Sequence, residues 1–202
     1  MTSNRKLSKA ELRTESQRSR ILCAATRCFV RSGFHSASMA NIADTAGMSP
    51  GLIYRYFESK NSIILAIIEQ QLLESRNRIH GLRTTSDLAD ALLKFCDGQN
   101  CGDESSANAT LFLEISSEAM RNDEIAEALG RYDQAIRAEL TDWIKHCAHR
   151  VDDSEATKIA EERALLLACL IEGLKVRKSR ERNLDRQAMK KAIDAMIHAL
   201  VN

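Results

Sequence analysis

Residues 38–60 read SMANIADTAGMSPGLIYRYFESK, and this stretch predicts two short helices joined by a tight turn. The first helix is expected over residues 39–46, with Ser38 as its N-terminal cap, because a serine hydroxyl accepts a bond from a free backbone N–H. Gly47 follows at once. A glycine can take the left-handed backbone conformation that ends a helix without a steric penalty. The segment therefore begins as a helix and then turns.

Ser49 and Pro50 predict the start of the second helix, over residues 50–56. Serine is a favoured cap, and proline suits the first helical position because its missing N–H would have no partner there. A helix, a short turn with glycine and a second helix together predict a helix-turn-helix unit.

The second helix carries groups that suit a DNA duplex. In helix-turn-helix units the second helix enters the major groove with its N-terminal residues toward the bases. Small residues there allow a close approach, while tyrosine and arginine donate to phosphates or to guanine. A lysine at the start of the next helix adds a cation at a helix N-terminus, which favours a phosphate. The predicted DNA contacts are Ser38, Ser49, Pro50, Gly51, Leu52, Tyr54, Arg55, Tyr56 and Lys60.

The alternative is a helical hairpin with a solvated polar face and no partner. Glycine turns between helices are common, so the turn alone does not decide between the two. The combination of two serine caps, Gly47, Pro50 and the segment YRYFESK favours the DNA interface.

Residues 21–57 (ILCAATRCFVRSGFHSASMANIADTAGMSPGLIYRYF) and 58–65 (ESKNSIIL) resemble the DNA-binding domain of the TetR family of transcriptional regulators. The match includes a Gly-Phe corner at residues 33–34. Two positions depart from the family pattern: Arg55 stands where an aromatic residue is frequent, and Tyr56 where histidine is frequent. Both side chains can still reach phosphates, so the resemblance leaves the preferred operator open rather than DNA binding itself.

The resemblance implies an all-α homodimer that usually represses. Such a protein binds a palindromic operator in double-stranded DNA and releases it when a small molecule enters the C-terminal domain. We therefore expect about nine helices: a three-helix helix-turn-helix domain over residues 17–62, then a larger effector-binding and dimerisation domain over residues 63–202. Residues 1–16 lack a sustained apolar period and are expected to form a flexible basic arm.

The charge distribution favours this division. The chain of 202 residues has a net charge of +1, which alone would argue against a nucleic-acid partner. Residues 1–60, however, hold ten Lys or Arg and four Asp or Glu, whereas the remainder holds nineteen and twenty-four. A basic first part on an acidic remainder suits a DNA-binding head on a regulatory body. The alternative is an uneven scatter of solvated charges.

The composition indicates a helical protein of the cytoplasm. One proline and eight glycines leave little room for a β-rich fold with many turns. No apolar run is long enough to cross a bilayer, and the basic N-terminus lacks the apolar core of a signal peptide. The six cysteines match no defensible metal or disulfide pattern, although Cys96, Cys101, His146, Cys147 and His149 could form a thiolate–imidazole site. We predict no metal and no cofactor.

A ligand pocket is expected between the helices predicted over residues 107–120 and 123–148 and their neighbours. Such pockets are mostly apolar with a few placed polar groups. The candidate lining residues are Phe95, Phe112, Glu114, Met120, Trp143, His146 and Arg177. Each polar one could equally be an ordinary surface residue, and the aromatic stripe could be core.

Two further helices are predicted over residues 154–176 and 187–200. The first carries the run LLLACLI, which is apolar nearly all round and needs cover on two sides, and the second carries one apolar stripe. Two such helices from each subunit could form a four-helix dimer interface about a two-fold axis. The candidate interface residues are Leu166, Leu170, Leu174, Met189, Ile193, Met196, Ile197 and Leu200. The alternative is that both helices complete the core of a monomer.

The sequence favours one class of function over two others. The leading hypothesis is a dimeric transcriptional repressor released from its operator by a small-molecule effector. The second is a DNA-bound structural or protein-interaction factor that uses the helical body as a docking surface. An enzyme is disfavoured because the sequence has no phosphate loop, GxSxG elbow, HExxH motif or dinucleotide fingerprint.

Overall fold

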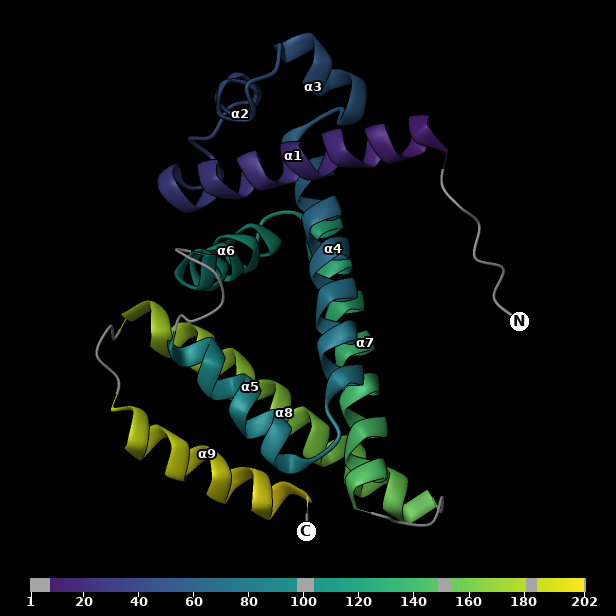
Figure 1. The fold of residues 1–202 in the computed structure, drawn as a ribbon, viewed down its shortest axis with the longest axis vertical. Coiled ribbons are helices and arrows are strands. Elements are labelled where there is room, and N and C mark those ends of the chain that lie inside the picture. Colours follow the sequence, from purple (N-terminus) through teal and green to yellow (C-terminus); the bar gives the residue numbers. More distant parts are fainter. Residues whose placement is uncertain (1–7, 98–103, 149–153, 181–184, 202) are drawn as a thin grey trace. The chain divides into compact units, whose positions relative to one another are not determined.

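A computed structural model describes residues 8–97, 104–148, 154–180 and 185–201. Over these residues the chain forms nine helices and no strand (Figure 1), which confirms the predicted all-α class. The helices are α1 (Lys9–Ser32), α2 (Met39–Ala46), α3 (Pro50–Tyr56), α4 (Lys60–Gly81), α5 (Thr85–Asp97), α6 (Glu104–Ala119), α7 (Asp123–Cys147), α8 (Ser154–Arg180) and α9 (Arg186–Val201). No helix in the described ranges combines the length and apolar character that a bilayer crossing requires.

The chain divides into two compact units, Met1–Ile67 and Ile68–Asn202. The division lies inside α4, five residues beyond the boundary expected after residue 62. Helix α4 therefore begins in the first unit and ends in the second.

Helices α2 and α3 have the bounds that the sequence predicts. The Ser38 hydroxyl accepts a hydrogen bond from the Asn41 N–H at 3.1 Å, and the Ser49 hydroxyl accepts one from the Leu52 N–H at 3.3 Å. Gly47 ends α2 in the left-handed conformation, with φ 62° and ψ 42°. Local capping and turn chemistry thus fix both helices.

Helix α1 starts earlier than the sequence pattern predicts. The flexible arm expected over residues 1–16 is helical from Lys9 onward, and residues 1–7 lie outside the described part. A capping box accounts for the early start: the Ser8 hydroxyl accepts from the Glu11 N–H, and the Glu11 carboxylate accepts from the Ser8 N–H at 2.7 Å. That backbone bond also lowers the pKa of Glu11 below its usual value.

The first unit closes around large apolar side chains from α1, α2, α3 and the start of α4. Ile21 and Phe29 of α1, Ile42 of α2 and Ile53 of α3 are almost wholly removed from solvent. Phe29 also meets Phe34 edge to face, with ring centroids 5.3 Å apart. Burying each such side chain contributes roughly 1.5–3 kcal/mol, so this core holds the short α2 and α3 in place.

The second unit has its core between α5, α7, α8 and α9. Helix α7 packs along α8, α5 packs against α9, and α6 contacts both α7 and α8. Leu140, Trp143, Ile144, Leu167 and Ile193 are buried at the centre.

Replacing Gly47 by alanine should destabilise the protein by about 1–2 kcal/mol, because a side chain at φ +62° is strained and its Cβ would lie 2.9 Å from the Arg20 guanidinium. Gly51→Ala is the matched control, since a Cβ there meets nothing within 4 Å and alanine favours a helix. Urea unfolding of both variants measures the difference. Equal midpoints would contradict the assigned turn.

Candidate nucleic-acid interface and cavity

Helix α3 has one buried and one exposed side. Ile53 is fully buried, and Phe57, directly after the helix, is 3% exposed, so these two side chains anchor α3 to its unit. Pro50, Gly51 and Arg55 are exposed, and Tyr54 is 53% exposed. The exposed side presents a guanidinium, a phenol and a small, open N-terminal turn, which are the groups that contact phosphates and base edges.

The other predicted contacts are less accessible. Leu52 and Tyr56 are half-buried. The hydroxyls of Ser38 and Ser49 remain exposed while they cap α2 and α3. The most exposed of the predicted contacts on α3 are therefore Pro50, Gly51, Tyr54 and Arg55, and all of the predicted DNA contacts stay predictions.

Lys60 has a structural role that the sequence did not reveal. Its ammonium donates to the carbonyls of Phe34 at 2.7 Å and His35 at 3.2 Å, and it lies 4.6 Å from the centre of the Phe34 ring. These contacts tie the start of α4 to the loop after α1. The prediction that Lys60 contacts a phosphate stays a prediction, because the two bonded carbonyls are neutral and leave the ammonium its charge.

Two arginines of α1 hold the helix-turn-helix at the turn and at the end of α3. Arg20 donates to the Gly47 carbonyl at 3.3 Å. Arg18 donates to the Tyr56 carbonyl at 3.4 Å, and its guanidinium carbon lies 4.5 Å from the centre of the Phe57 ring. Neither residue is predicted by the sequence pattern, since nothing local in the chain connects them to α3.

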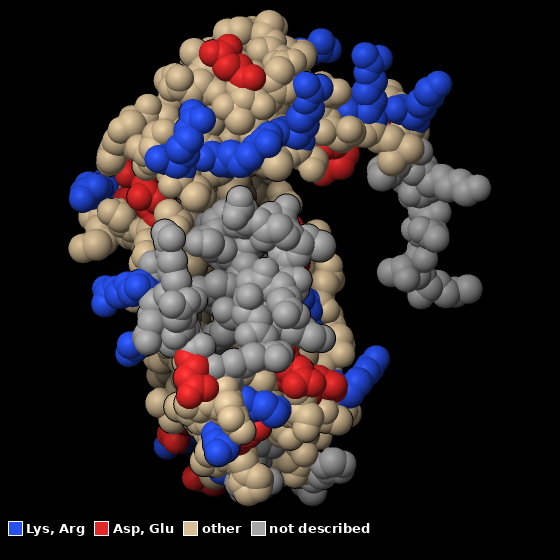
Figure 2. All heavy atoms as spheres, turned by 60° about the vertical axis from the view of Figure 1, so that its left-hand side comes forward, with Lys and Arg blue, Asp and Glu red and all other residues tan. Residues whose placement is uncertain are grey.

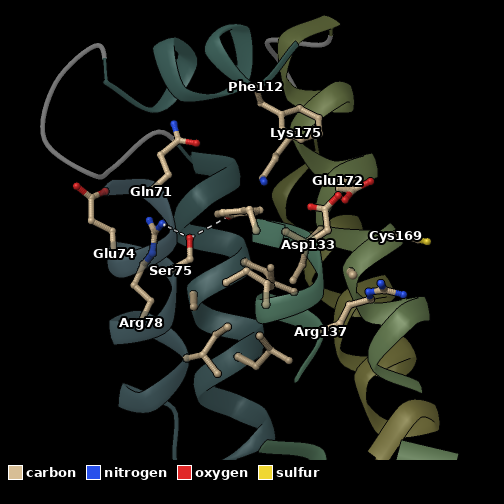
Figure 3. Close-up of a pocket in the computed structure, with 18 of the residues that line it drawn as sticks. Gln71, Glu74, Ser75, Arg78, Phe112, Asp133, Arg137, Cys169, Glu172 and Lys175 are labelled. Carbon is tan, nitrogen blue, oxygen red and sulfur yellow. Dashed lines mark hydrogen bonds between the residues drawn. The ribbon is translucent and has the colours of Figure 1, made fainter. Parts of the chain in front are cut away.

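The second unit contains a cavity of about 540 Å³ (Figure 3). Its apolar wall comes from α4, α5, α7 and α8 and the residue after α4, and includes Ile79, Leu82, Leu92, Ile136 and Ile171. This volume lies within the range of small-molecule pockets, about 300–1,000 Å³.

One part of the cavity is polar. Arg78 donates to the Ser75 hydroxyl at 3.2 Å, and that hydroxyl lies 3.2 Å from the Tyr132 hydroxyl, as the dashed lines in Figure 3 show. Lys175 lies with its ammonium 4.5 Å from the centre of the Phe112 ring. The cavity therefore presents donors and acceptors beside an apolar wall.

Burial perturbs the ionisable groups of this lining. Desolvation lowers the pKa of Lys175, which the charge of Glu172 partly opposes. Desolvation also raises the pKa of Asp133, and the nearby Glu172 carboxylate raises it further. Burial likewise raises the pKa of Tyr132. Ionisable groups whose pKa values are shifted by burial in a cavity are typical of binding sites.

The cavity differs from the predicted ligand site. Of the predicted residues, Phe112 lines the cavity, and the side chain of Phe95 lies outside the described part. Trp143 belongs to the core, Met120 is 87% exposed, and His146 and Arg177 are exposed. Glu114 is half-buried and does not line the cavity. Trp143 thus packs in the core and Met120 faces solvent, while the cavity forms around the end of α4 with Phe112 in its lining.

The predicted dimer residues fall into two groups. Leu174, Ile193 and Ile197 are buried inside the second unit, and Leu170, Met189 and Leu200 pack beside them. Leu166 and Met196 are exposed by 58% and 42%, and remain available to a partner. Three of the eight are therefore corrected to core, because the faces of α8 and α9 that carry them cover α5 and α7.

The thiolate–imidazole cluster considered from the sequence does not form within the described residues, which contain no group of three or more potential metal ligands. Cys101 and His149 lie outside that part of the chain, as does the side chain of Cys96. His146 is exposed, and burial raises the pKa of the Cys147 thiol.

Comparison with known families decides the relationship. Residues 21–67 match the bacterial regulatory proteins of the tetR family, and residues 87–202 match the C-terminal domain of BetI-type transcriptional repressors. The chain belongs to the TetR family. The second match covers most of the unit that holds the cavity, from residue 87 onward.

Individual members of the family show where the similarity lies. The chain is 36% identical to the HTH-type transcriptional regulator UidR of Escherichia coli K12 over 124 residues, 58% of this chain and 60% of that relative. It is 28% identical to the regulator BetI of Rhizobium meliloti over 167 residues, 81% of this chain and 78% of BetI. The solved structure of Salmonella enterica GusR superposes with a TM-score of 0.75 at 26% identity and covers 97% of this chain and 98% of that one.

Replacing Lys60 by alanine should lower the stability of the first unit by about 1–3 kcal/mol, because the variant cannot form the two charged hydrogen bonds to the loop after α1. Thermal unfolding followed by circular dichroism measures the change. Arg55→Ala is the control and should leave the melting temperature unchanged, since that side chain is exposed. If both variants melt like the parent protein, the structural role of Lys60 is wrong.

Proposed function

We propose that this TetR-family protein is a transcriptional regulator that binds operator DNA through α3. The observation that carries the proposal is the exposed face of Pro50, Gly51, Tyr54 and Arg55 on a helix whose opposite face is anchored. A rigid helix with small residues at its N-terminus suits the major groove. The basic balance of residues 1–60 supports the same partner.

The second part of the proposal is release by a small molecule bound in the cavity. The cavity combines an apolar wall with the polar group of Arg78, Ser75, Tyr132 and Lys175, which favours an effector with an apolar body and a polar head. Ser75 and Arg78 stand on α4, the helix that begins in the DNA-binding unit. An effector that prefers one position of α4 would shift the protein toward a form with different DNA affinity.

The third part is a homodimer that reads a palindrome. The exposed Leu166 on α8 and Met196 on α9 support it, as do Leu165, exposed by 47%, and the similarity of this unit to BetI-type repressors. That similarity also favours repression over activation. Two copies of α3 would meet half-sites about 10 base pairs apart, or a multiple of that spacing.

A docking factor is the second candidate, favoured by the same exposed leucines on α8. The cavity favours the effector-responsive regulator. A cavity with polar groups in its lining lowers the stability of the fold, and docking of a protein on the outer surface does not require one.

Arg55→Ala should weaken binding to DNA fragments selected from the source genome and reduce the salt slope by about 0.9 for each phosphate that the protein no longer neutralises. Fluorescence anisotropy at several salt concentrations measures both quantities. Arg131→Ala, an exposed cation on α7, is the control and should change neither. Unaltered affinity of the Arg55 variant would contradict the assigned reading face.

Filling the cavity with Ala168→Trp should abolish binding of an amphipathic probe, the dye 1-anilinonaphthalene-8-sulfonate, which we expect the parent protein to bind with increased fluorescence. In the parent protein the dye should also weaken DNA binding, and in the variant it should not. Ala138→Trp, at an exposed position on α7, controls for the added indole. Equal dye binding by the Ala168 and Ala138 variants would count against the cavity as the effector site.

A further inference from the structure

Helix α1 carries a row of cations along one exposed face. Lys9, Arg13, Arg20, Arg27 and Arg31 are all exposed. At 3.6 residues per turn their positions fall within about 40° of one another around the helix axis. We call these five residues the α1 ridge. Figure 2 shows Lys and Arg side chains gathered in a row on the N-terminal unit.

The ridge holds no acidic residue. The two carboxylates of α1, Glu11 and Glu15, lie roughly 200–240° around the helix from Lys9, on the opposite side. Within the described residues, no ridge cation forms an ion pair with a carboxylate. Like charges four residues apart, as at Lys9 and Arg13 or Arg27 and Arg31, destabilise a helix. The cost of each such pair is small, and a bound polyanion would offset this repulsion.

Arg20, in the middle of the ridge, lies beside the turn that precedes α3. The Arg20 guanidinium donates to the Gly47 carbonyl, in the turn directly before α3. The ridge extends from this point in both directions, over about 33 Å from Lys9 to Arg31 at 1.5 Å per residue. That length is close to one turn of B-DNA, about 34–36 Å.

We propose that the α1 ridge is a second DNA-binding surface. It contacts phosphates on either side of the site that α3 binds, whatever the base sequence there. The inference rests on the proposed function for the partner, and adds a separate set of residues. Arginine suits this role because its guanidinium donates to phosphate oxygens in a fixed fork. Contacts of this kind set affinity and salt dependence rather than specificity.

The test is a triple variant of the full-length protein, Arg13→Gln, Arg27→Gln and Arg31→Gln. Arg20 is kept because it also supports the turn. The matched control removes three exposed cations from the second unit, Arg83→Gln, Arg131→Gln and Lys158→Gln, so both proteins have the same net charge. Anisotropy titrations over a salt series use a genome-selected fragment and an unrelated duplex of about 40 base pairs, long enough to extend beyond two half-sites.

The expected result is that the salt slope of the ridge variant falls by about 0.9 for each phosphate that it no longer neutralises, equally on both duplexes, while the control behaves like the parent protein. When the selected fragment is shortened so that the DNA flanking the central site is removed, the ridge variant and the parent protein should have the same salt slope. A ridge variant with the parent's slope on both duplexes would overturn the inference. A second result would also overturn it: size-exclusion chromatography shows two duplexes bound to the parent protein and one bound to the ridge variant. The ridge would then bind a separate duplex and not the flanks of the same site.

Failure of the ridge is distinguishable from failure of the proposed function. If the parent protein binds no DNA, the proposal that it is a DNA-binding regulator is wrong. A parent protein that binds DNA, with an Arg55→Ala variant that binds weakly and a ridge variant that binds normally, would remove the ridge alone.

Discussion

The anchoring of α3 is the constraint on which the DNA-binding surface depends. A helix of seven residues is not stable alone in water, because nucleation is unfavourable and few hydrogen bonds follow it. Here Ile53 and Phe57 are buried, Ser49 caps the first turn, and Arg18 and Arg20 of α1 hold the two ends. The anchored side leaves Tyr54 and Arg55 facing solvent. The exposed side of α3 keeps a fixed position because the opposite side of the helix is anchored to the first unit.

The charged side chains of this protein have different roles, which depend on the groups around them. Lys60 and Arg18 bind carbonyls and ring faces inside the first unit. The ridge cations of α1 have no carboxylate on their own face of the helix. In the second unit, Lys175 and Asp133 line a cavity, where desolvation lowers the pKa of Lys175 and raises the pKa of Asp133. The net charge of +1 is a sum over the whole chain, so it indicates none of these three arrangements.

The sequence predicted α2 and α3 to the residue, because serine caps, Gly47 and Pro50 act within a few positions of the chain. It did not predict that Lys60 binds the loop after α1, and it left open whether Trp143 lines a pocket or belongs to the core, since both outcomes depend on contacts distant in sequence. The cavity left one usable signal: Glu172 and Lys175 interrupt an otherwise apolar run, LLLACLIEGLKV. Ionisable residues on a helix covered by others suggest a polar site.

The most direct measurement is hydroxyl-radical footprinting of the protein on fragments selected from its source genome. A symmetric pair of α3 helices predicts two protected stretches on one face of the duplex, related by a palindrome, with centres about 10 base pairs apart or a multiple of it. A single protected stretch without symmetry, or uniform protection along the fragment, would contradict the reading of DNA by two copies of α3.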